Sequence, residues 1–235
     1  MATLQFPIVR KTVPNVKVPG TNTALLTEAR KMPCLSWSLP AHDACPAALF
    51  GENAICGSNK KAHDGCYAFK GRYMMNVVRR AQMARFGWAV QCMRTPEGQD
   101  EFVRTMVDAI AQDRSGYFRV HDSGDLFSPT YTRCWARICR ALPDIRFWFP
   151  TRTWRFLDRP SWAGALLELA ALPNVTLRPS ALYFDDVAPK IPGMAAGSTA
   201  TTKGFTCPAP MQGNACQSCR ACWISTETPI SYHKH

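Results

Sequence analysis

The sequence lacks any apolar run of about 18 residues, the length that a membrane-spanning helix needs. Residues 1–20 contain Arg10, Lys11 and Lys17 but no apolar core of the kind found in secretory signals. Charged residues are few, at 19%, and the hydrophobic content of 46% is typical of a folded chain rather than a disordered one. We therefore expect a cytoplasmic protein that has no membrane partner.

The 11 cysteines cannot all be paired in disulfides within the chain, because their number is odd. Without an export signal, so many cysteines are typical of reduced thiols in a reducing cytoplasm. Reduced thiols can ligate metals, and the spacing of the cysteines divides them into three groups with different expected roles.

The strongest group lies near the C-terminus, where Cys207 is followed by Pro208 and then by a compact run of three thiols. The run is Cys216, Cys219 and Cys222, with two residues between successive cysteines. Thiolate sets of this kind hold iron–sulfur clusters or zinc. A compact run of three with one ligand set apart is more typical of ferredoxin-type cluster loops. We therefore expect an iron–sulfur cluster, of the 4Fe–4S type, with zinc as the alternative metal.

A second group lies in the segment 32–71, which is rich in proline and glycine and has no long periodic stretch. Its cysteines are spaced about ten residues apart: Cys34, Cys45, Cys56 and Cys66. A metal would staple such an irregular segment, although buried thiols would also explain these cysteines. Cys34 is the weakest ligand candidate, because it can lie on a strand. A second cluster among these cysteines is therefore an open alternative to a single C-terminal one.

The third group, Cys92, Cys134 and Cys139, is expected in the core. Cys134 and Cys139 share a predicted helix face with Trp135 and Ile138. A buried thiol packs as a small apolar group, so no metal ligation is needed to explain this group.

Apolar periodicity predicts a regular alternation of elements in the second half of the chain. It favours helices at 72–93, 97–113, 129–142 and 161–172, and strands at 117–121, 145–149 and 174–177. Ser128 before Pro129 is a typical helix start. This β–α–β alternation predicts an α/β fold in which helices cover a parallel sheet. The strand spacing of about 28 residues suits a β/α barrel or a doubly wound sheet.

The candidate apolar positions of the helix at 72–93 are Met74, Met75, Val78, Met83, Phe86 and Val90. The domain organisation follows from the cysteine-rich and apolar stretches. We expect an extended lead-in at 1–31, one α/β domain at 32–223 and a tail at 224–235. Within the domain we expect a cysteine-rich loop at 32–71, a flexible loop at 192–206 and a cysteine knuckle at 207–222.

Polar residues follow each predicted strand, where parallel α/β folds gather their functional groups. Asp122, Ser123 and Asp125 come after the first strand, Arg152 after the second and Arg178 at the end of the third. We expect the three residues after the first strand to contact a ligand and the two arginines to hold an anionic group. Helix capping and bonds within loops are the structural alternative.

The net charge of +11 and the pI near 9.3 make nucleic acid a candidate partner. Arg152, Trp154 and Arg155 could contact phosphates and stack on bases. The alternative function is therefore a metal-stapled nucleic-acid-binding protein without catalysis. A protein whose clusters are purely structural and which docks on a partner protein also remains open.

Several short motifs in a fixed order resemble the phage gene product eighty-eight family of cysteine-rich proteins. They are Ser36-Trp37-Ser38-Leu39-Pro40-Ala41, Cys45-Pro46, Cys66-Tyr67-Ala68, Ser123-Gly124-Asp125, Arg178-Pro179-Ser180 and Cys207-Pro208-Ala209. The resemblance covers residues 33–223. It implies a protein of phages or mobile elements, in the cytoplasm of the host cell.

A more distant resemblance is to radical S-adenosylmethionine enzymes, which are incomplete or complete β/α barrels. Cys66-Tyr67-Ala68 is similar to the end of their cluster loop, and Ser123-Gly124-Asp125 to the turn that binds their cosubstrate. The resemblance implies an incomplete barrel, S-adenosylmethionine binding and an auxiliary C-terminal cluster. Their Cys-x3-Cys-x2-Cys loop is absent, because Cys45, Cys56 and Cys66 are about ten residues apart. Enzymatic activity is therefore open.

Overall fold

The computed structural model describes residues 14–29, 31–59 and 64–234, so residues 1–13 and residue 30 of the predicted lead-in at 1–31 lie outside the described residues. A parallel four-stranded sheet forms the centre of the fold, which confirms the predicted α/β class. Its strands are β1 (Leu35–Trp37), β2 (Tyr117–Val120), β3 (Arg146–Thr151) and β4 (Val175–Pro179). They lie side by side in chain order, and each pairs in parallel with the next.

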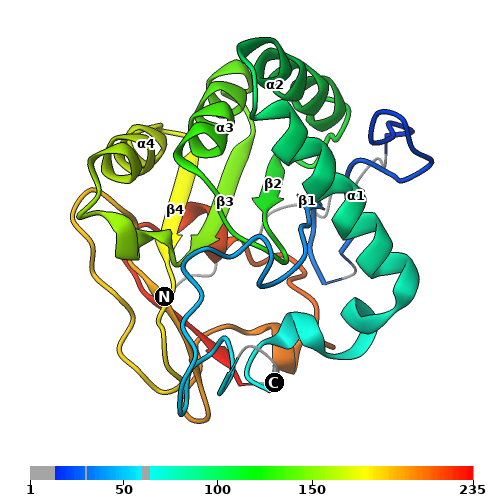
Figure 1. Ribbon diagram of the computed structural model, residues 1–235. Helices are drawn as coiled ribbons and strands as arrows, with labels where there is room; N and C mark the ends of the chain where they lie inside the picture. The colour runs from blue at the N-terminus through cyan, green and yellow to red at the C-terminus, as the bar shows by residue number, and fades with distance from the viewer. Residues whose placement is uncertain (1–13, 30, 60–63, 235) are drawn as a thin grey trace.

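The major helices connect these strands. They are α1 (Asn76–Cys92), α2 (Pro96–Ile110), α3 (Pro129–Ala141) and α4 (Pro160–Ala170). Because successive strands are added in one direction and such crossovers are right-handed, the helices lie on one side of the sheet (Figure 1). We call this side the helix-covered face. The opposite side, covered by irregular segments, is the loop-covered face.

Aromatic and aliphatic side chains fill the helix-covered face. Phe118, Phe147 and Phe149 are fully buried, and Trp135 of α3 lies over them. The ring centroids of Trp135 and Phe149 are 5.7 Å apart in an edge-on arrangement. Full burial of such a side chain stabilises a fold by about 1.5–3 kcal/mol. This face therefore carries much of the stability of the domain.

The predicted start of α3 is confirmed at Ser128. Its hydroxyl accepts a hydrogen bond of 3.1 Å from the backbone N–H of Tyr131, and Pro129 occupies the first helical position. Thr95 caps α2 in the same way, accepting from Gly98 N–H at 3.1 Å. Each cap satisfies an N–H group that would otherwise lack a partner at the helix start.

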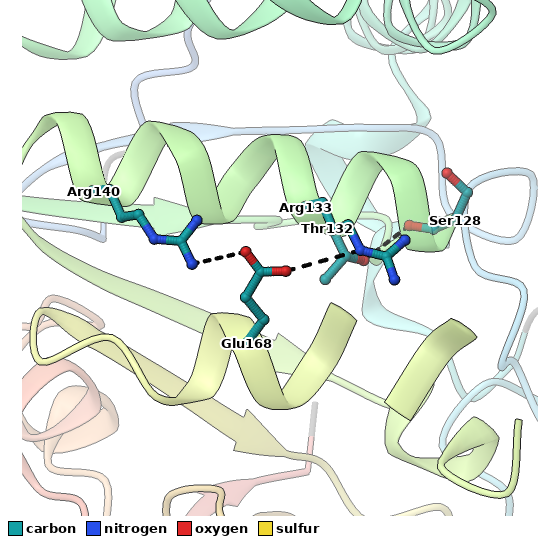
Figure 2. A network of polar contacts seen from close by, with 5 residues as sticks. All are labelled: Ser128, Thr132, Arg133, Arg140 and Glu168. Atoms are coloured by element: carbon teal, nitrogen blue, oxygen red, sulfur yellow. Dashed lines mark hydrogen bonds and ion pairs between the residues drawn. The ribbon is translucent and has the colours of Figure 1, made fainter. Parts of the chain in front are cut away.

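One carboxylate on α4 joins α3 to α4 on the outside of the molecule (Figure 2). Glu168 accepts from Arg140 at 2.7 Å and lies 3.8 Å from Arg133. In the same view, the Thr132 hydroxyl donates to the Ser128 carbonyl at 2.9 Å. The three charged side chains are partly exposed, and exposed pairs contribute at most about 1 kcal/mol each. The apolar contacts between the two helices matter more.

The buried side of α1 differs from the prediction. Of the candidate apolar positions, Met74 and Met75 precede α1, and they and Met83 are 43%, 52% and 50% exposed, so these three do not contribute to its buried side. α1 instead buries two polar side chains: Gln82 donates to Ser38 Oγ at 3.0 Å, and Arg85 donates to the Leu25 carbonyl at 2.8 Å. These partners come from distant segments, and apolar periodicity cannot reveal them.

A second, two-stranded parallel sheet joins segments that were expected to be a loop and a tail. It pairs β5 (Ser198–Thr201) with β6 (Ile230–His233), so the predicted loop at 192–206 and tail at 224–235 each contain a strand. The remaining helical elements are short: η1 (Tyr67–Phe69), η2 (Gly71–Met74), η3 (Thr153–Phe156), η4 (Ala209–Met211) and α5 (Ala221–Ile224). None of the helices in the described part of the chain is long and apolar enough to cross a membrane.

Candidate metal centre on the loop-covered face

The loop-covered face is polar and aromatic where the helix-covered face is apolar. Because side chains alternate along a strand, Arg119, Trp148, Thr176 and Arg178 point away from the side that carries Phe118 and Phe147. Of these four residues, the sequence analysis gave a role only to Arg178. The others could have been identified as the residues that alternate with apolar ones along the strands.

The C-terminal segment docks on this face through Trp223 of α5. The indole of Trp223 donates to the Phe118 carbonyl at 2.9 Å, and its own carbonyl accepts from Thr176 Oγ1 at 2.7 Å. The ring of Trp148 lies edge-on to Trp223 at 5.3 Å. Trp223 directly follows Cys222, so these contacts place the cysteine knuckle against the sheet.

The four C-terminal cysteines, Cys207, Cys216, Cys219 and Cys222, come together there, and we call them the C-terminal thiol group. Burial raises the pKa of the Cys216 thiol, and the nearby Cys207 and Cys219 raise it further. Burial also raises the pKa of Cys222 to about 12, with Cys216 and Cys207 adding to the shift. Such mutual effects indicate that the thiols lie within electrostatic range of one another.

Buried N–H donors without an acceptor adjoin this group. They are Arg119 Nε, Trp148 Nε1 and Arg220 Nε, none of which has a hydrogen-bond partner within the described residues. The Arg119 guanidinium lies 4.7 Å from the Trp148 ring centroid and acts electrostatically on Cys216. Buried donors are usually paired, so these three N–H groups have free capacity to donate to a bound acceptor.

Cys34 lies beside the C-terminal thiol group. It is fully buried in an apolar cluster with Met32, Trp148, Cys216 and Trp223. The Cys216 thiol is 3.9 Å from the Met32 sulfur. Cys34 is thus separated from the cysteines with which its position in the sequence associated it.

Cys45, Cys56 and Cys66 form a separate N-terminal thiol group. Burial raises the pKa of Cys45 well above its usual value, and Asp125, Cys56 and Cys66 raise it further. A Cβ atom on Gly65 would lie 2.5 Å from the Ala54 carbonyl oxygen, so only glycine fits before Cys66. This close approach of Gly65 to residues 54–57 brings Cys66 near Cys56.

Asp125 and Arg152 lie next to the N-terminal thiol group, at the carboxyl ends of β2 and β3. Asp125 accepts from Thr151 Oγ1 and Leu126 N–H, each at 2.7 Å, and from Arg152 N–H at 2.9 Å. The Arg152 side chain donates to the Ala181 carbonyl at 3.1 Å. Asp125 therefore joins the loops that follow β2 and β3. The predicted contact of Asp125 with a ligand would be a second role for the same carboxylate.

Asp122 and Ser123 are buried close by, each with one polar side-chain atom that lacks a partner. These atoms are Asp122 Oδ1 and Ser123 Oγ, unpaired across the described residues. Burial raises the pKa of the Asp122 carboxyl, while Arg119 opposes the shift. The Tyr67 hydroxyl donates to the Asp122 carbonyl, and so does that of Tyr73, at 3.3 Å. These two residues retain the free hydrogen-bonding capacity that a ligand contact needs.

Arg178 is the most enclosed of the predicted residues, with no exposed surface. Its two terminal nitrogens donate to backbone carbonyls of Ala196, Gly197, Ser225 and Thr228. Only its Nε is left without a partner in the part of the chain that is described. The guanidinium therefore ties two C-terminal segments to β4, and little of it remains for an anion.

The third cysteine group lies in the core as expected. Cys92, Cys134 and Cys139 are each at most 4% exposed. The Cys134 thiol contacts the Met93 sulfur at 3.8 Å. Burial raises the pKa of Cys92 and of Cys134 to about 11, so both are unreactive thiols at neutral pH.

The N-terminal and C-terminal thiol groups consist of residues that can ligate a metal. Their side chains, however, are not arranged as a ligand sphere. Over residues 14–29, 31–59 and 64–234, no three His, Cys, Asp or Glu side chains are placed to hold a metal ion. Neighbouring thiols, partly shielded from water and bordered by orphan N–H donors, nevertheless suit a sulfur-ligated anionic centre. Closing such a centre requires side-chain rotations, and metal binding would deprotonate the thiols.

Fold and site together define a parallel α/β protein with two thiol-rich segments, one at the end of its sheet and one beneath it. The chain belongs to the Gene product 88 family, whose model matches residues 14–225. This confirms the resemblance to the phage family.

Relatives come from mycobacteriophages. The chain is similar to the Gene 88 protein of Mycobacterium phage L5, with 54% identity over 67 residues, 28% of this chain and 23% of that protein. It is also similar to the Gene 88 protein of Mycobacterium phage D29, with 40% identity over 60 residues, 26% of this chain and 22% of that protein. The matched segments thus span less than a quarter of either relative. No solved structure matches the chain.

Proposed function

We propose that the protein binds an iron–sulfur cluster through the C-terminal thiol group. One observation carries this proposal: the four C-terminal cysteines lie within electrostatic range of one another, on the face where Arg119, Trp148 and Arg220 have buried N–H groups without a partner among the described residues. Iron–sulfur clusters have thiolate ligands and accept hydrogen bonds at their sulfurs. Arg119 and Arg220 would offset the negative charge of such a centre. The cluster supplies one-electron transfer or a structural staple when bound.

The N-terminal thiol group supports a second cluster. Its three thiols, Cys45, Cys56 and Cys66, lie by the carboxyl ends of the parallel strands, where α/β folds place their chemistry. Three thiols would leave one coordination position for another ligand. Cys34 lies with the other group, so it is not part of this proposal.

A radical-S-adenosylmethionine-like incomplete barrel is the finer fold assignment that we propose. Four parallel strands in chain order, with helices on one side, are what such an arc of βα units requires. In that case Asp122 and Ser123, which each have an unpaired atom, would contact S-adenosylmethionine, and Arg152 would lie nearby.

The structure weakens one of the two arguments for nucleic-acid binding, the one that rests on Arg152, Trp154 and Arg155. Each side chain of the arginine and tryptophan run donates to a backbone carbonyl: Arg152 to Ala181, Trp154 to Ser180 and Arg155 to Ala47. These side chains hold loops together. The net charge of +11 remains as the support for this alternative.

Metal analysis of anaerobically purified protein tests the proposal. We expect a brown protein with iron and acid-labile sulfide in similar amounts. Cys216→Ala should lose the C-terminal cluster and Cys66→Ala the N-terminal one, each removing about half of the iron if two clusters are present. Cys92→Ala, a core cysteine outside both groups, is the matched control and should keep all of it.

The outcomes separate the alternatives. If Cys66→Ala keeps all of the iron and Cys216→Ala loses it, only the C-terminal cluster exists. If the wild-type protein is colourless with one zinc per group, the iron–sulfur proposal is wrong.

A further inference from the structure

The outward side of α1 is apolar and basic, whereas the same helix buries polar side chains. Val77 is 62% exposed and Met83 50%. Exposed Arg79 and Arg80 lie beside them, because residues three or four apart on a helix are neighbours. Gly87 follows Met83 by one turn on the same side. We call Val77, Arg79, Arg80, Met83 and Gly87 the methionine–arginine surface, and α1 lies on the outside of the fold (Figure 1).

The charge around this surface has one sign. Residues 65–96 contain six Lys or Arg and no Asp or Glu. The exposed arginines of α3 pair with Glu168 and Asp100. The side chains of Arg79 and Arg80, by contrast, make no ion pair within the described residues. Unpaired cations beside exposed apolar side chains are complementary to a partner that carries both apolar groups and carboxylates.

Gly87 is a second sign of a partner on this side of α1. It lies in the interior of the helix without a positive φ, and a Cβ atom there would meet none of the described residues within 4 Å. Neither backbone conformation nor packing within the chain therefore requires glycine, which destabilises a helix interior relative to alanine. A missing side chain at the centre of an exposed helix face lets the backbone of a second helix approach closely.

We propose that the methionine–arginine surface binds an acidic amphipathic helix of another protein. Methionine and arginine are enriched at protein interfaces, where aspartate and glutamate are depleted, and the flexible thioether of methionine adapts to the side chains it contacts. Apolar side chains of the partner helix pack on Val77 and Met83, its carboxylates pair with Arg79 and Arg80, and its backbone crosses α1 at Gly87. This inference goes beyond the proposed function and does not need a cluster.

Nucleic acid is the competing partner, since exposed arginines also bind phosphates. Proteins that bind single strands stack bases on aromatic side chains, whereas the apolar members of this surface are Val77 and Met83. The nearest tyrosines in the chain, Tyr67 and Tyr73, both donate their hydroxyls to the Asp122 carbonyl. The composition of the surface therefore favours a protein helix.

The experiment measures binding of the full chain to a labelled helical peptide by fluorescence polarisation. The probe has leucine at every third or fourth position and glutamate elsewhere. We expect saturable binding that Gly87→Leu weakens at least about tenfold, because the new side chain fills the crossing point. Leucine is the better helix former, so this variant should melt at or above the wild-type temperature, which separates loss of binding from loss of folding.

A charge-reversal pair tests the surface independently. Arg79→Glu combined with Arg80→Glu should weaken binding at least about tenfold. Arg104→Glu combined with Arg114→Glu is the matched control, because these exposed arginines lie elsewhere and give the same change in net charge. The control should keep the wild-type affinity. A peptide with lysine in place of glutamate should not bind.

Failure of the glutamate peptide to bind the wild-type protein overturns the inference. So do equal losses in the two charge-reversal proteins, which indicate net charge alone, and unchanged binding by Gly87→Leu. If a single-stranded oligonucleotide binds this surface and the peptide does not, the partner is nucleic acid. If sedimentation shows a dimer that Gly87→Leu abolishes, the partner is a second copy. Each of these results leaves the proposed cluster untouched, because the iron content of the variants is measured separately.

Discussion

The two faces of the parallel sheet are built from alternate residues of the same strands, yet they differ in kind. On the helix-covered face, Phe118, Phe147 and Phe149 are fully buried under α3, and the polar atoms left unpaired there, within the described residues, are Trp135 Nε1 and His121 Nδ1. On the loop-covered face, Arg119 and Trp148 present buried N–H groups with no acceptor in the described chain. The helix-covered face is filled by apolar side chains, whereas the unpaired donors of the loop-covered face lie close to the C-terminal cysteines.

This difference separates stability from function in the molecule. Changes on the helix-covered face should lower the free energy of unfolding of the whole domain. Changes on the loop-covered face should loosen the C-terminal segments and remove the proposed cluster, while the sheet and its helices remain folded. The following variants test that separation in order of decreasing effect.

Phe149→Ala should have the largest effect on stability. The side chain is fully buried against Trp135, so its removal leaves a cavity and should lower the free energy of unfolding by about 3–5 kcal/mol. Urea denaturation followed by circular dichroism measures this. Phe149→Leu fills most of the space and should lower the free energy of unfolding much less. Equal decreases in the two variants would contradict the packing argument.

Arg178→Met should act mainly on the loop-covered face. Removing the guanidinium leaves the carbonyls of Ala196 and Ser225 without their donor, at an expected cost of about 2–3 kcal/mol. Hydrogen exchange should become faster in β5 and β6. If hydrogen exchange in α3 and β3 became faster to the same extent, the two faces would not be energetically separate.

Acidification should weaken the helix-covered face through His121. Burial lowers the pKa of this imidazole to about 3, and its Nε2 lies 3.0 Å from the Tyr131 hydroxyl. In the unfolded chain the His121 imidazole binds a proton near pH 6.5, whereas in the folded protein it does so only near pH 3. Stability contributed by neutral His121 is thus complete above pH 6.5 and is lost as the pH falls towards 3.

The expected slope from this residue is about 1 kcal/mol per pH unit below pH 6. Denaturation curves at several pH values measure it. His121→Asn, which suits the positive φ of 70° at this position, should remove that part of the slope. An unchanged slope in this variant would assign the acid sensitivity to other groups.

Ser128→Ala should lower the free energy of unfolding by about 1 kcal/mol, because α3 loses the hydroxyl that accepts from Tyr131 N–H. Ser128→Asn keeps a capping oxygen and should stay close to wild type in thermal unfolding. A loss in the asparagine variant as large as that in the alanine variant would count against the cap.

Met83→Gln should have the smallest effect, below about 0.5 kcal/mol, because this side chain of α1 is 50% exposed. Met106→Gln in α2 is the matched comparison, since Met106 is fully buried and the same change there should be strongly destabilising. Similar melting temperatures for the two variants would contradict the assignment of the α1 surface.

How far the sequence predicts this molecule depends on the range of the interactions involved. The start of α3 and the alternation of parallel strands with helices follow from local signals, namely Ser128 before Pro129 and the repeated β–α spacing. The burial of Gln82 and Arg85 does not, because their partners Ser38 and Leu25 lie tens of residues away. The same applies to β5 and β6, which pair across more than twenty residues.

The candidate site shows the same limit. Spacing predicts the C-terminal thiol group, because its cysteines are close in the chain, and these thiols are neighbours in the fold. Spacing places Cys34 with Cys45, whereas the fold places Cys34 beside Cys216. Arg119 was not singled out, since it lies between core residues on a strand.

The most direct measurement is the iron and acid-labile sulfide content per chain of the wild-type protein, purified without oxygen, next to that of Cys216→Ala. We expect iron and sulfide in near-equal amounts in the wild-type protein, and a loss of the C-terminal share of both in the variant. A wild-type protein without sulfide, or a variant that keeps its full iron and sulfide, would contradict the assignment of a cluster to the loop-covered face.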